Sequence, residues 1–171
     1  MGVKSESETA AMKSGMTVGR KSDRELVVTR TFNAPARLVF EAWTKAELFR
    51  RWWVPKSMGM VLLSCEMDVR VGGKYRLEFA HGDSNAAFFG TYKEVTPHSR
   101  LVWTNEESDD GAVTTVTFEE QDGNTLLAMH ELYPSKEALD AAGTGAADAM
   151  GETFEQLDQL LATLSASVGR S

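Results

Sequence analysis

The sequence is short of the residues from which several common kinds of site are built. Its single cysteine, Cys65, can form neither an internal disulfide nor a thiolate metal cluster. The three histidines, His81, His98 and His130, lie on separate segments without the paired spacing of metal ligands. No histidine or lysine stands close to Cys65 in the sequence, so a structural thiol fits it better than a nucleophile. We expect no metal, no cofactor and no catalytic residue of these kinds.

Long apolar runs and phosphate-binding motifs are also missing. No run approaches the ~20 residues that span a bilayer, and the first residues lack the apolar segment of a secretory signal. The glycine pair in Val71-Gly72-Gly73-Lys74 opens a hairpin, whereas a nucleotide-binding loop would open a helix. Together with the single thiol, these absences lead us to expect a cytoplasmic protein with no membrane partner.

Positive charge is scarce over most of the chain. The formal net charge is -7, and the first 24 residues carry two more basic than acidic side chains, so the remainder is close to -9. No stripe of lysine and arginine interleaved with aromatic residues is present. An acidic body repels phosphate backbones, so we expect no nucleic-acid partner.

The composition fits one domain. A chain of 171 residues with 42% hydrophobic content can bury one sizeable core. Residues 1–23 are rich in small, polar and charged residues without a sustained period, which predicts a disordered arm. We expect the domain to cover residues 24–165 and residues 166–171 to be a flexible C-terminus.

The pattern along the domain predicts a strand, two short helices, an antiparallel meander and a long helix. The first strand runs from Glu25 to Phe32 and ends at Asn33-Ala34-Pro35, and helices follow from Ala36 and from Ala46 to Trp53. Turn signals about ten residues apart then separate five or six strands, for which there are six candidates. These are Leu62–Asp68, Lys74–Ala80, Ala86–Thr96, Arg100–Asn105, Val113–Glu120 and Thr125–Leu132.

The last part of the chain changes to a helical period. Met150, Phe154, Leu157, Leu161 and Leu164 fall on one stripe. The sheet and this helix must bury their apolar faces against each other, which predicts an α+β fold.

Three short motifs carry a resemblance to a known family. They are Asn33-Ala34-Pro35, Trp52-Trp53-Val54-Pro55 and the pattern Asp68-x-Arg70-x-Gly72-Gly73. Their order resembles the START-like (SRPBCC) superfamily, and within it the family named after the activator of heat-shock protein 90 ATPase. The resemblance runs from about Glu25 to Leu164. It implies a helix-grip (START/Bet v 1-like) fold, in which a curved antiparallel sheet wraps a long C-terminal helix and leaves a cavity near two short helices.

Strand parity then indicates which side chains face that cavity. The alternative for every one of them is that it fills a solid core. The ligand-binding candidates are Trp53, Met67, Tyr75, Leu77, Phe79, Tyr92, Trp103, Leu127, Met129, Glu131, Met150 and Phe154.

Glu131 and four of the motif residues can be interpreted as functional or as structural. Glu131 shares the parity of Leu127 and Met129, and a buried carboxylate is costly without a partner, so it either meets a ligand or reaches solvent at the strand end. One indole of Trp52 and Trp53 is expected to pack under the sheet and the other to stand at the cavity mouth. An ion pair with turn hydrogen bonds accounts for Asp68 and Arg70.

Three functions remain open at this point. The favoured one is binding of a small apolar or aromatic molecule in the cavity. The second is an enzyme of the polyketide cyclase or hydratase kind, in which one acid or base assists a positioned substrate. The third is stimulation of a chaperone ATPase, as the family name suggests; we rank it last, because the upstream sequence is only a short polar arm. We expect a monomer or a weak homodimer.

Overall fold

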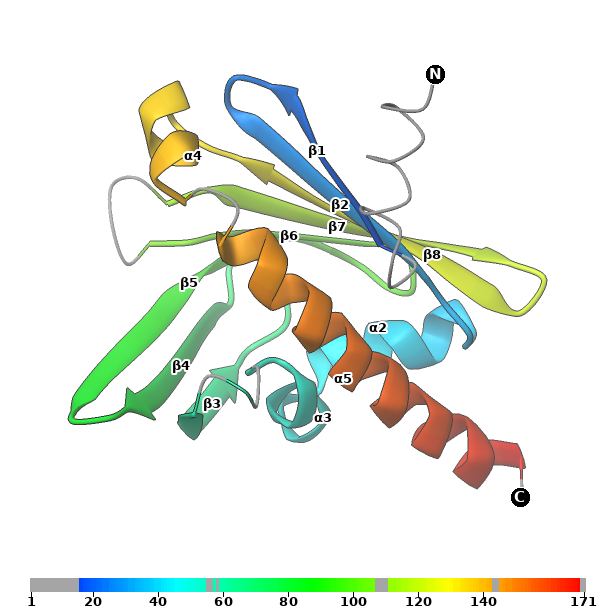
Figure 1. The fold of residues 1–171 in the computed structure, drawn as a ribbon. Coiled ribbons are helices and arrows are strands. Elements are labelled where there is room, and N and C mark those ends of the chain that lie inside the picture. The colour runs from blue at the N-terminus through cyan, green and yellow to red at the C-terminus, as the bar shows by residue number, and fades with distance from the viewer. Residues whose placement is uncertain (1–15, 55–56, 58, 107–110, 143–144, 170–171) are drawn as a thin grey trace.

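The computed structural model describes residues 16–54, 57, 59–106, 111–142 and 145–169. In this part of the chain, eight antiparallel strands form one sheet in the order β1-β2-β8-β7-β6-β5-β4-β3 (Figure 1). The strands are β1 (Met16–Ser22), β2 (Glu25–Phe32), β3 (Met60–Met67), β4 (Lys74–His81), β5 (Ser84–Thr96), β6 (Arg100–Thr104), β7 (Val113–Gln121) and β8 (Asn124–Leu132). The helices are α2 (Ala36–Thr44), α3 (Ala46–Trp52), α4 (Lys136–Ala142) and α5 (Gly145–Gly169).

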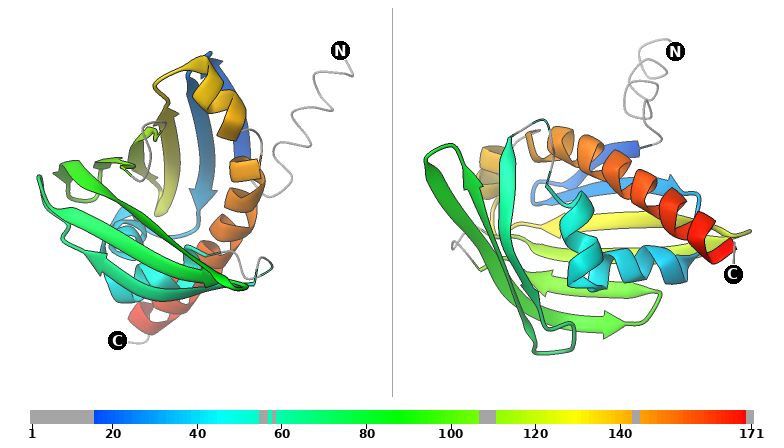
Figure 2. Two further views of the ribbon diagram at one scale, coloured as in Figure 1. Left: turned by 90° about the vertical axis from the view of Figure 1, so that its left-hand side faces the viewer. Right: turned by 90° about the horizontal axis from the view of Figure 1, so that it is seen from below.

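The sheet is bent into two parts that meet at β5. This strand has 13 residues and pairs with both β4 and β6, and its register against β6 shifts between Tyr92 and Glu94. A bulge of this kind increases the local twist and bends the strand. Figure 2 shows the result: β3, β4 and β5 turn away from the part formed by β1, β2, β7 and β8, and α5 crosses the open side.

Helices α2 and α3 are fixed to the sheet and to each other by buried or partly buried polar groups. The backbone N–H of Ala36 donates to Oε1 of Glu120 on β7 at 2.9 Å, which places a carboxylate at the start of α2. The indole N–H of Trp52 donates to the carbonyl of Ala42 at 2.9 Å, and this side chain is fully buried. The two short helices therefore present one continuous apolar surface to the sheet.

Helix α5 holds the end of α3 against the core. The side-chain amide of Gln156 donates to the carbonyls of Trp52 and Val54, each at 2.9 Å. Phe154 packs edge-on against Phe32 of β2, with ring centroids 5.6 Å apart. Leu157 and Leu161 are buried on the same stripe, as the helical period predicts.

The predicted α+β helix-grip fold is confirmed, and the six strands of the meander lie close to their predicted bounds. Two boundary predictions are wrong. Residues 16–22, expected in a disordered arm, form β1 and pair with β2, where Val18 packs on the core and Arg20 forms an ion pair with Asp140 at 2.7 Å. Helix α5 continues to Gly169, past the predicted domain end at residue 165. Residues 1–15, 170 and 171 lie outside the described part.

Candidate functional site

A pocket lies between the inner face of strands β3–β6 and helices α2 and α3. Its cavity volume is about 40 Å³, room for only a few water molecules, whereas sites for drug-sized ligands measure about 300–1,000 Å³. Side chains therefore fill most of the space between these elements. The lining residues are Trp43, Phe49, Trp53, Met67, Tyr75, Leu77, Phe88, Tyr92, Trp103 and Asn105.

Aromatic rings form most of the wall. Phe49 and Trp53 stack with centroids 4.8 Å apart and planes 26° apart, and the rings of Trp43 and Trp103 lie 5.9 Å apart. Such offset and tilted arrangements are the favourable ones for aromatic pairs. Phe88 is 39% exposed, so it stands where the pocket opens to solvent.

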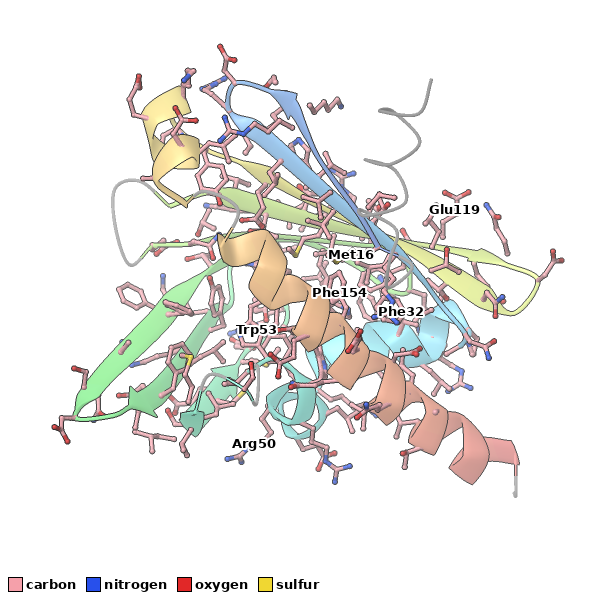
Figure 3. All side chains as sticks on the ribbon, in the orientation of Figure 1. Met16, Phe32, Arg50, Trp53, Glu119 and Phe154 are labelled. Atoms are coloured by element: carbon pink, nitrogen blue, oxygen red, sulfur yellow. The ribbon has the colours of Figure 1, made fainter. Side chains whose placement is uncertain are left out.

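The two adjacent tryptophans have different environments. Trp52 is fully buried and hydrogen-bonded, whereas Trp53 is half-buried and lines the pocket. Figure 3 shows Trp53 on the inner side of the molecule, while Arg50 of α3 points outward to solvent. The helix thus presents one indole for packing and one to the pocket.

One end of the pocket is polar, and its groups form a hydrogen-bonded series. The phenol of Tyr75 lies 2.8 Å from the carbonyl oxygen of Thr104 and 3.1 Å from Oδ1 of Asn105. The amide nitrogen of Asn105 donates to Oγ1 of Thr114 at 3.0 Å. The hydroxyl of Thr114 in turn donates to Oε1 of Glu131 at 2.6 Å. The polar end of the pocket is therefore connected to a half-buried carboxylate on β8.

Gly90 makes this arrangement possible. Tyr75 and Gly90 are direct partners across β4 and β5, and the tyrosine ring crosses over the glycine to reach Thr104 on β6. A Cβ atom at Gly90 would lie 1.8 Å from the Thr104 carbonyl oxygen and 2.8 Å from Cε2 of Tyr75. Only glycine leaves enough space for the close approach of these groups.

Two further polar groups of the lining are held in apolar surroundings. The indole Nε1 of Trp43 is buried and has no hydrogen-bond partner in the described part of the chain. Burial raises the pKa of the Tyr92 phenol well above its ordinary value, and the nearby Cys65 and Asp68 add to that effect. Tyr92 therefore stays protonated at neutral pH and is not a general base.

The structure brings six of the predicted binding residues together around the pocket. These are Trp53, Met67, Tyr75, Leu77, Tyr92 and Trp103. Phe79, Leu127, Met129 and Phe154 are buried in the core outside the lining, and the side chain of Met150 lies outside the described part. Glu131 is likewise absent from the lining and contacts Thr114.

Sequence reasoning missed four lining residues. Phe88 has the parity of Tyr92, and Asn105 has the parity of Trp103, so the alternation pattern already contained a signal for both. Trp43 and Phe49 lie on helices, where the apolar period separates buried from exposed residues but does not show which buried residues border a void.

The remaining motif residues have structural roles. The Nε of Arg70 lies 2.9 Å from Oδ2 of Asp68, as expected for an ion pair within the turn. A Cβ at Gly73 would lie 2.0 Å from the Asp68 carbonyl oxygen, so the turn requires glycine there. Cys65 is half-buried, and burial raises its pKa. Among the described residues, no group of three or more potential ligands is arranged to hold a metal ion.

The sequence model of the family described as activator of Hsp90 ATPase homolog 1-like protein matches residues 33–162. The chain belongs to this family. The match covers most of the chain, including β3–β8, both short helices and the pocket. A search of curated protein sequences finds no match. No helix in the described ranges is long and apolar enough to cross a membrane.

Solved structures of similar proteins share the fold of this family member. A protein from Rhodobacter sphaeroides is 26% identical, with a TM-score of 0.80, and the match covers 87% of this chain and 99% of that one. A protein from Staphylococcus epidermidis is 25% identical, with a TM-score of 0.73 and coverages of 86% and 94%. A protein from Nitrosomonas europaea shows the same fold at 22% identity, with a TM-score of 0.77 and coverages of 85% and 99%.

Proposed function

We propose that this protein binds a small molecule with a single aromatic or apolar ring in the pocket between β3–β6 and helices α2 and α3. The observation that carries the proposal is a partly open void walled by aromatic side chains, with one polar end at Tyr75 and Asn105. Ligand sites are usually concave and apolar, with a few polar groups that set orientation.

The size of the void limits the ligand. A cavity of about 40 Å³ is smaller than a benzene ring needs, since a ring of that size occupies an engineered cavity of about 150 Å³. Binding therefore requires movement of side chains at the opening. Phe88, which is 39% exposed, is the most exposed of the lining residues, and Trp53, Met67 and Asn105 are half-buried. A single ring fits this picture better than a fused ring system.

The chemistry of the lining favours binding over catalysis. The titratable side chains that line the pocket are Tyr75 and Tyr92, and the pKa of Tyr92 is raised by burial. The carboxylate connected to the pocket, that of Glu131, lies behind Thr114 and Asn105. An acid or base of a cyclase or hydratase has to reach the reacting group directly or through one water.

Isothermal titration of the full chain with toluene and 4-methylphenol tests the proposal. Met67→Trp places an indole in the pocket and should weaken binding of both probes by at least about tenfold. Met60→Trp is the matched control, because Met60 is the same residue type at the opposite end of β3 and is not part of the lining. Binding to the Met60 variant should match the parent.

The outcome that refutes the proposal is equally specific. If the interior is solid, neither probe binds the parent. Met67→Trp then lowers the melting temperature, because an indole overpacks the core and reduces the free energy of unfolding by roughly 1–3 kcal/mol. Retained stability together with lost probe affinity supports a pocket.

A further inference from the structure

The hydrogen bonds behind the pocket run in one fixed direction. An ionised carboxylate can only accept, so the Thr114 hydroxyl must donate its proton to Glu131, 2.6 Å away. Oγ1 of Thr114 then acts as an acceptor for the Asn105 amide nitrogen at 3.0 Å. Thr114 and Glu131 are also direct partners across β7 and β8, so the sheet itself holds this pair in register.

Two acceptors fix the side-chain amide of Asn105. Its nitrogen donates to the Ala112 carbonyl at 2.6 Å as well as to Thr114. Rotating the amide by half a turn would place Oδ1 against the Ala112 carbonyl oxygen, and two acceptors would then face each other. Oδ1 therefore points the other way, towards the Tyr75 phenol at 3.1 Å.

Among the described residues, the polar end of the pocket consequently has more acceptor than donor capacity. The one proton of the Tyr75 phenol lies within reach of two acceptors, the Thr104 carbonyl at 2.8 Å and Asn105 Oδ1 at 3.1 Å. A phenol has a single O–H to donate, and the shorter contact is with Thr104. Asn105 belongs to the pocket lining, so its Oδ1 can accept a hydrogen bond from a bound molecule.

We propose that the pocket selects ligands that carry a hydrogen-bond donor, a phenolic hydroxyl or a ring N–H, which Asn105 Oδ1 accepts. Glu131 lies outside the lining, and the Ala112 carbonyl, which can only accept, fixes the orientation of the Asn105 amide. The proposal rests on the binding function proposed above. Burial supports it, because Tyr75 is 8% and Thr114 only 2% exposed, so water competes little for these bonds.

The test compares three probes of similar shape on the full chain by isothermal titration: 4-methylphenol, 4-methylanisole and toluene. The first can donate, the second can only accept, and the third does neither. One additional hydrogen bond in a shielded site should make 4-methylphenol bind about tenfold tighter than 4-methylanisole. Equal binding of the phenol and the ether, or tighter binding of the ether, overturns the donor preference while the binding function stands. If none of the three binds, the proposed function fails and the selectivity fails with it.

Glu131→Gln tests which acceptor, the Ala112 carbonyl or Oγ1 of Thr114, fixes the Asn105 amide. A carboxamide can donate to Thr114 as well as accept, so the direction of the series is no longer imposed. The phenol should keep most of its preference over the ether, because the Ala112 carbonyl still fixes the orientation of the Asn105 amide. Toluene affinity should not change, since Glu131 is not part of the lining.

Glu119→Gln is the matched control. It removes the same charge from the exposed side of β7, where Glu119 accepts from Gln121 and points away from the body (Figure 3). This variant should keep the full donor preference. A Glu131→Gln protein that loses the preference while its toluene affinity is unchanged would overturn the role of the Ala112 carbonyl in fixing the Asn105 amide.

Discussion

A methyl group at Gly90 should disrupt the polar end of the pocket more than its size suggests. The Cβ of Gly90→Ala would lie 1.8 Å from the Thr104 carbonyl oxygen and 2.8 Å from Cε2 of Tyr75. The nearest of these atoms belongs to the backbone of β6, so it cannot move aside as a flexible side chain would. The two strands must separate by more than 1 Å before the contact reaches 3.0 Å.

The cost of that separation can be worked out from the neighbouring bonds. The Glu106 N–H donates to the Phe89 carbonyl at 2.8 Å and the Thr91 N–H to Oγ1 of Thr104 at 3.1 Å, on either side of Gly90. Opening the strands lengthens both beyond hydrogen-bond range, at about 1 kcal/mol each. Overpacking adds roughly 1–3 kcal/mol. We expect the free energy of unfolding to fall by about 3 kcal/mol or more.

Thermal and urea unfolding of matched variants would measure this effect. A loss of about 3 kcal/mol corresponds to a melting temperature lower by about 6–12 °C for a chain of this length. Gly19→Ala is the control, because Gly19 also lies in a strand, and a Cβ there would meet nothing within 4 Å. It should be neutral, or stabilising by up to about 1 kcal/mol. Equal stability of the two variants would refute the reasoning about the close approach of β5 and β6.

Two further predictions concern α5 and the sheet. Gln156→Glu replaces an amide that donates to two carbonyls with a buried carboxylate that cannot donate. The free energy of unfolding in urea should fall by about 3 kcal/mol or more. The same change at the exposed Gln159 should lower it by less than about 0.5 kcal/mol. Equal costs would contradict the role of Gln156. The side chain of His130 lies 2.6 Å from the Glu25 carboxylate, and this hydrogen bond holds the pKa of Glu25 below its usual 4.5. The contribution of the ionised Glu25 to stability is therefore complete above pH 4.5 and is lost as the pH falls. His130→Ala should therefore flatten the decline of stability below pH 4.5, and superimposable pH profiles of the two proteins would show that the pair is not coupled to folding.

Sequence patterns predicted the meander well because each strand has its own alternation and its own turn. Gly72 and Gly82, both with positive φ, occupy two of those turns. Strand β1 was missed for a physical reason. Its residues are mostly exposed or half-buried, and it is stabilised by pairing with β2 along one edge, so its own sequence carries little alternation.

Strand parity identified the inward residues but not which of them border a void. Leu127 and Met129 do face inward, and they are 0% and 5% exposed. They lie on β8, which packs against α2, whereas Tyr75 and Trp103 lie on β4 and β6 and line the pocket. The division between these two regions of the sheet comes from the bend at β5, a feature of three-dimensional packing that a period of two cannot encode.

The volume of the pocket and the polarity of its lining depend on different elements. Tyr75 and Asn105 are positioned by paired strands and by hydrogen bonds to backbone carbonyls, so the polar end has little freedom. The aromatic wall on the other side comes from Phe49 and Trp53 at the end of a short helix, which Gln156 of α5 holds in place. Changes in α3 or α5 should therefore alter the volume available to a ligand, and changes around Asn105 should alter which hydrogen-bonding group the ligand needs.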